Sequence, residues 1–69
     1  MKKNYFKIKE KTLLLREYNV LISDLILLIN HCIKYGFCYD IYYSRYLYYK
    51  SLAANVKNEI KKLESEDNV

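Results

Sequence analysis

Two apolar rows, one on each side of the only glycine, dominate the pattern of this chain. Both rows advance in alternating steps of four and three residues. The first row consists of Leu14, Tyr18, Leu21, Leu25, Leu28 and Cys32. The second row consists of Tyr42, Tyr46, Tyr49, Ala53, Val56, Ile60 and Leu63. Because this spacing lines one stripe of a helix, each row predicts a long helix packed against one partner helix.

The residues around Gly36 predict where the first helix ends and the second begins. Glycine readily takes the left-handed conformation that closes a helix, and Asp40 is a suitable N-cap for the next one. The chain contains no proline that would interrupt either helix. We therefore expect one all-α domain over residues 1–69, an antiparallel hairpin of two long helices. The expected bounds are a helix over about 12–35, a turn over 36–40 and a helix over about 41–63.

Both ends of the chain are strongly charged, with opposite signs. Residues 1–11 carry five lysines and one glutamate, and residues 63–69 carry three acidic side chains. We expect the N-terminal segment to be a frayed basic lead-in, with Asn4 or Thr12 as the N-cap of the first helix. We expect the C-terminal segment to be a frayed acidic tail, because its carboxylates oppose the negative end of the helix dipole.

A turn near residue 36 also predicts the register of the hairpin. The sequence numbers of facing residues should add up to about 70. This register places Asp24 beside Arg45, which would form a weak surface ion pair. It also places Glu10 near Glu59, where two like charges would meet.

A second apolar row adjoins the first on the N-terminal helix, and a single partner helix cannot cover both. Lysine stems on the facing helix would cover this second row only in part. Two-fold dimers are the commonest oligomers, so the sequence predicts a homodimer in which two hairpins form a four-helix bundle. The predicted dimer or partner interface consists of Leu15, Ile22, Ile26, Ile29, Ile33, Tyr43 and Leu47.

Side chains capable of chemistry gather near the turn but match no known arrangement. His31, Cys32, Cys38 and Asp40 are all metal-capable, yet their spacing fits no zinc signature. A disulfide between the two cysteines is an alternative that a reducing compartment disfavours. The cysteine and histidine lack an orienting third group and an oxyanion hole. We therefore expect no enzymatic activity, no metal, no cofactor and no small-molecule substrate.

A stripe of basic and aromatic side chains runs along the second helix, in a chain whose net charge is +4. We call Tyr43, Lys50, Lys57 and Lys61 the lysine stripe, and Tyr48 lies on the far side of the same helix. Lysines can contact phosphates and aromatic rings can stack on bases, so nucleic acid is one candidate ligand. The alternative is that the stripe is an ordinary lysine face in contact with solvent. The layout resembles the Rop type of RNA-binding hairpin dimers in plasmid copy-number control, without a shared motif. That resemblance implies a nucleic-acid-binding homodimer.

The sequence predicts a cytoplasmic protein. The apolar stretch over residues 20–33 is too short and too polar to span a membrane. The short apolar run Leu13–Leu15 is followed at once by Arg16 and Glu17, unlike a signal peptide. Frequent Lys, Asn, Ile and Tyr, which have AT-rich codons, suggest an AT-rich bacterium or one of its phages.

These observations favour a small non-enzymatic regulator or inhibitor that binds another protein. In size and composition the chain is similar to phage and mobile-element proteins that block a host machine, anti-CRISPR proteins included. One alternative is the nucleic-acid-binding homodimer, which would use Tyr48 and the lysine stripe. Another is a subunit of a larger complex, in which a different protein covers the isoleucine-rich row.

Overall fold

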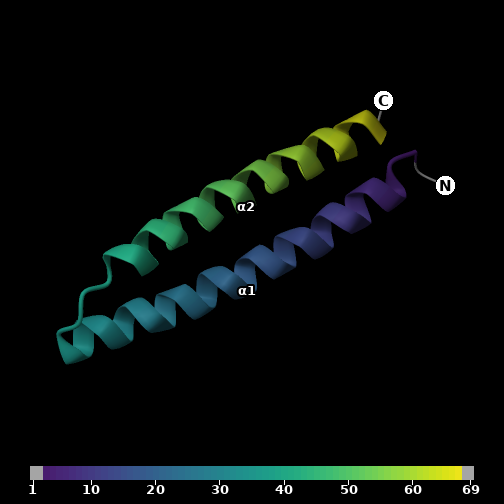
Figure 1. Ribbon diagram of the computed structural model, residues 1–69. Coiled ribbons are helices and arrows are strands. Elements are labelled where there is room, and N and C mark those ends of the chain that lie inside the picture. The colour runs from purple at the N-terminus through teal and green to yellow at the C-terminus, as the bar shows by residue number, and fades with distance from the viewer. Residues whose placement is uncertain (1–2, 68–69) are drawn as a thin grey trace.

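The computed structural model describes residues 3–67, which form two long antiparallel helices (Figure 1). Helix α1 spans Tyr5–Tyr35 and helix α2 spans Asp40–Asp67. A short loop joins them at one end of the molecule, and the start of α1 and the end of α2 lie at the other end. The molecule is a rod with extents of 53 × 14 × 12 Å. The predicted all-α antiparallel hairpin is confirmed.

The turn is built around Gly36, as predicted. This residue has φ of 75°, and its N–H donates a hydrogen bond to the carbonyl of Cys32. The N–H of Phe37 donates to the same carbonyl over 2.8 Å, so the last turn of α1 is closed by two bonds. Helix α2 starts slightly earlier than expected, because the carbonyl of Tyr39 accepts a bond from the N–H of Tyr43. Asp40 is therefore the first helical residue rather than the N-cap.

The chain ends are helical where the sequence predicted fraying. Asn4 is only 3% exposed, and its N–H donates to the Asp67 carboxylate over 3.1 Å. Its Nδ2 donates to the Leu63 carbonyl over 3.2 Å and to the Glu66 carboxylate over 3.3 Å. We call this set of contacts the Asn4 latch. It holds the N-cap residue of α1 against the last turn of α2.

Helix dipoles explain why the acidic tail stays helical. The carboxylate of Asp67 opposes the dipole of its own helix, but it lies beside the N-terminal end of α1, which carries partial positive charge. The sequence-based expectation counted only the first effect. Asn4 is the N-cap residue of α1, one of the two predicted candidates, but its side chain makes no capping bond and reaches across to α2 instead. Thr12 lies inside the helix, where its hydroxyl donates to the carbonyl of Ile8 over 2.7 Å.

The residues through which the helices contact each other form the seam. On α2 the seam is the predicted row: Ala53 and Val56 are buried, and the rest are partly buried, namely Tyr42, Tyr46, Tyr49, Ile60 and Leu63. On α1 the prediction is wrong for two of the six positions. Leu21 and Leu28 are 40% and 43% exposed. The seam of α1 follows the neighbouring row instead: Ile8, Lys11, Leu15, Tyr18, Ile22, Leu25, Ile29 and Cys32.

The N-terminal extension of α1 explains this rotation of the seam. Three adjacent rows of the helix are apolar, and α2 can cover only two of them. The row that contains Leu14 continues to Lys7, whereas the row that contains Leu15 continues to Ile8. Since α1 begins at Tyr5, the seam that keeps Ile8 inside buries more apolar surface.

The register agrees with the prediction, although one charged pair differs. The rings of Tyr18 and Tyr49 lie 6.1 Å apart, and Lys11 forms an ion pair with Glu59. Both contacts fit facing numbers that add up to about 70. Glu59 therefore meets a lysine rather than Glu10. Over residues 3–67, neither helix contains a stretch long and apolar enough to cross a membrane.

Candidate interaction surfaces

The hairpin buries few of its apolar side chains. Among residues 3–67, four apolar residues are buried, namely Leu25, Cys32, Ala53 and Val56. Over the same range sixteen large hydrophobic side chains are exposed. Extensive exposed apolar surface on a small protein marks sites of contact with other macromolecules. These exposed side chains lie in separate groups on the surface of the hairpin.

One group lines a groove between the two helices. We call it the leucine face; it consists of the exposed Leu21, Leu28 and Tyr48, together with the partly buried Leu14 and Leu52. The groove has a volume of about 440 Å³ and is lined by Leu21, Asp24, Leu25, Leu28, Arg45, Tyr48 and Tyr49. The predicted neighbours Asp24 and Arg45 thus lie at one groove, on the edge of this face. Sequence reasoning assigned all three α1 leucines of this face to the seam and so missed the face.

A second group lies on the opposite edge of the hairpin. We call Ile26, Ile33, Tyr43 and Leu47 the isoleucine edge, and their exposed fractions range from 42% to 58%. These are four of the seven residues predicted to form a dimer or partner interface. The other three, Leu15, Ile22 and Ile29, lie partly buried in the seam, so they are not an uncovered row.

The lysine stripe borders the isoleucine edge. Lys50, Lys57 and Lys61 are exposed, and they follow Tyr43 along α2 toward the chain ends. Nζ of Lys50 donates to the hydroxyl of Tyr46 over 3.2 Å and lies 5.3 Å from the centroid of that ring. This contact combines a hydrogen bond with a cation–π interaction and fixes the lysine on the helix surface.

Tyr48 does not join the lysine stripe. Its ring packs edge-on against Tyr49 with centroids 5.4 Å apart, and it lines the groove of the leucine face. The structure therefore separates two elements that the sequence offered together as contacts for nucleic acid or a partner. The lysines lie on one edge of the rod and Tyr48 on the other.

The outer sides of the two helices differ in polarity. The residues of α1 that point away from α2 are exposed and apolar at steps of seven: Phe6, Leu13, Val20 and Leu27. The corresponding residues of α2 are small and polar: Ser44, Ser51, Asn58 and Ser65. The outer side of α1 is therefore apolar and uncovered, whereas the outer side of α2 is polar. The sequence shows this contrast once the position of the seam is known.

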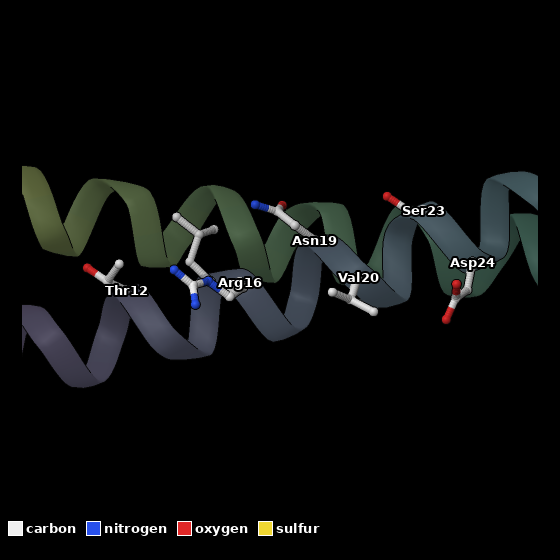
Figure 2. A pocket seen from close by; sticks show the side chains of 7 residues that line it. Thr12, Arg16, Asn19, Val20, Ser23 and Asp24 are labelled. Atoms are coloured by element: carbon white, nitrogen blue, oxygen red, sulfur yellow. The ribbon is translucent and has the colours of Figure 1, made fainter.

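A hollow on the outside of α1 does not form a ligand site. Its volume is about 450 Å³, and all seven lining residues belong to this one helix. Figure 2 shows that their side chains point in different directions, with Thr12 and Ser23 on one side of the ribbon and Val20 and Asp24 on the other. A small molecule there would stay largely exposed to solvent, unlike one in an enclosed pocket.

The groups near the turn are dispersed rather than convergent. Cys32 is buried and Cys38 is exposed, and both are free thiols. The ring of His31 packs against Tyr35, with centroids 4.6 Å apart. Within residues 3–67, no three His, Cys, Asp or Glu side chains come close enough to share a metal ion.

Comparison with known proteins adds no family to this description. No protein family, no curated protein and no solved structure matches this chain significantly.

Proposed function

We propose that this protein is a small non-enzymatic binding protein, a dimeric helical hairpin that acts by binding another protein in the cytoplasm. The observation that carries the proposal is the apolar surface that the hairpin leaves exposed on both edges of its seam. Two-helix packing gives this surface no cover, so contact with other chains would lower the free energy of the system.

The isoleucine edge and the lysine stripe together suggest the chemistry of the protein partner. Four apolar side chains lie near the turn, and three lysines continue the same edge toward the chain ends. An apolar patch beside positive charge suits a partner surface with apolar side chains next to acidic ones. The rod would then act by covering that surface. Blocking a host machine such as a CRISPR effector is the kind of function that this mode of action serves.

Affinity capture from extracts of the native host, with nuclease treatment, tests the proposal. The expected result is one protein recovered reproducibly by the wild-type chain. Leu47→Glu should lose that protein, because it places an acid in the isoleucine edge, which is proposed to face acidic groups. Ser51→Glu is the matched control, since it adds the same charge on the polar outer row of α2. Equal capture by the wild type and by Leu47→Glu would contradict the proposed surface.

A nucleic-acid-binding dimer is the second candidate, and the exposed lysine stripe is the observation that favours it. If lysines neutralise phosphates, binding must weaken steeply as salt is raised. The double variant Lys50→Glu/Lys57→Glu should then abolish the shift of mixed RNA and DNA in a gel. A wild-type protein that shifts neither nucleic acid at low salt would remove this candidate.

A subunit of a larger complex is the remaining alternative. In that case the captured partner would be present in fixed stoichiometry, and a single copy of the hairpin would be bound to it. Light scattering of the purified complex separates this outcome from a dimer that binds a target.

A further inference from the structure

We infer that a second copy of this chain covers the leucine face, with the two-fold axis running parallel to the helices. In this arrangement α1 of each copy packs against α2 of the other, and both turns lie at the same end of a four-helix bundle. The inference rests on the proposed dimer and is independent of the proposed protein target.

The shape of the leucine face suits another helix. Three leucines occupy one row of α1 over consecutive steps of seven, and they adjoin the two rows already in the seam. An apolar arc of three rows is typical of helices that contact two neighbours in a bundle. The groove of about 440 Å³ between Leu21, Leu28 and Tyr48 offers space for side chains of the second neighbour.

Charge determines which helix of the second copy fits there. Acidic residues border the leucines on α1 at steps of seven, namely Glu10, Glu17 and Asp24. The corresponding border of α2 carries Arg45 and Lys62, and its acids Glu59 and Glu66 already have partners within the chain, Lys11 and Asn4. Over residues 3–67, the border of α1 is thus acidic, and the border side chains of α2 that form no ion pair or hydrogen bond within the chain are basic.

A two-fold axis parallel to the helices brings the unlike borders together. With the same register as within the hairpin, Asp24 lies beside Arg45 of the partner subunit. In the same register Glu10 lies beside Glu59 of the partner subunit, a carboxylate that already pairs with Lys11 of its own chain. Symmetry repeats the pair of Asp24 with Arg45, so the dimer gains two complementary contacts around an apolar centre.

The other two-fold arrangement brings like charges together. An axis perpendicular to the helices would pack α1 against α1 of the second copy in reversed direction. Centred on Leu21, it sets Glu17 beside Asp24 of the partner subunit, and it does so twice. Like charges placed opposite each other at an interface repel, so this arrangement is disfavoured.

The isoleucine edge is a poorer surface for self-association. A second copy there would bring the lysine stripe and Arg16 near the same groups of its partner. Using the leucine face instead leaves the isoleucine edge and the lysine stripe outward on both copies. The assembled dimer would therefore present two identical surfaces to a target.

A charge-swap mixing experiment tests this arrangement. Asp24→Arg and Arg45→Asp are each prepared, and each should dimerise about tenfold more weakly than the wild type, because each homodimer meets two like-charge pairs. An equimolar mixture should recover the dimer mass and the helix content, since only the mixed dimer pairs unlike charges at both positions. Contacts within one chain cannot explain recovery, because both variants carry like charges at positions 24 and 45.

The results of this experiment distinguish the existence of the dimer from the arrangement of its helices. A wild-type chain that is monomeric in sedimentation equilibrium overturns both the dimer and its arrangement. A wild-type dimer with no recovery on mixing overturns only the arrangement. An Asp24→Arg variant that dimerises more tightly than the wild type would indicate α1 against α1 instead. Leu28→Glu should abolish the dimer and its matched variant Ile33→Glu should retain it, and the reverse result would place the interface on the isoleucine edge.

Discussion

The Asn4 latch should be the most sensitive polar contact of the hairpin. Asn4→Ala removes the bond from Nδ2 to the Leu63 carbonyl and the bond to the Glu66 carboxylate. A buried bond to a neutral acceptor contributes about 1 kcal/mol and one to a charged acceptor about 2 kcal/mol. Because both bonds are only part-buried, we expect a loss of about 2 kcal/mol in the free energy of unfolding. For a domain of this size that loss lowers Tm by roughly 8–16 °C.

Circular dichroism during thermal unfolding, at one fixed protein concentration, measures this effect. Asn4→Ser is the informative companion variant, because serine can cap a helix but cannot reach α2. The latch predicts that Asn4→Ser is nearly as destabilised as Asn4→Ala. Asn58→Ala, on the polar outer row of α2, controls for loss of an amide in general. If serine restored wild-type stability, the contribution would be helix capping and the reasoning about the latch would be refuted.

Three further predictions concern the turn, the core and the thiols. Gly36→Ala should cost about 1 kcal/mol in denaturant unfolding, because φ is 75° and no atom within 4 Å obstructs a Cβ; a larger loss would mean that the turn has a packing role. Val56→Ala should cost about 2 kcal/mol, since Val56 is 6% exposed, whereas Val20→Ala, at 55% exposed, should cost almost nothing. Cys38 should react with a thiol reagent at once and Cys32 only on unfolding, and equal rates would place Cys32 outside the core.

The architecture of two helices and a turn could be predicted from the sequence, because several local sequence features indicate it independently. One glycine between two 4-3 rows predicted two helices and the turn. On α2 only the row with alternating steps of four and three residues is apolar along the whole helix. The seam through Ala53 and Val56 could therefore be predicted directly.

On α1 the sequence left a choice that only the whole chain resolves. Leu21 and Ile22 are equally apolar neighbours, and either could face α2. The choice depends on Lys7 and Ile8, in a segment whose helical state depends in turn on contacts with residues 63–67. Such long-range dependence cannot be read from local periodicity, so the row that contains Leu21 was assigned to the seam and the row that contains Ile22 to the uncovered surface.

The candidate surfaces were predictable where they lie on one helix and not where they combine residues of both helices. Lys50, Lys57 and Lys61 were recognised as one stripe, because steps of seven and four keep them on one side of any straight helix. Tyr48 was not linked to Leu21 and Leu28, because that juxtaposition needs the relative rotation of the two helices.

The mass of the wild-type protein in solution tests the central claim most directly, that the hairpin is half of a symmetric bundle. Sedimentation equilibrium at low micromolar concentration should give twice the chain mass of 8.4 kDa. A mass of a single chain, with full helix content in the same sample, would contradict the account.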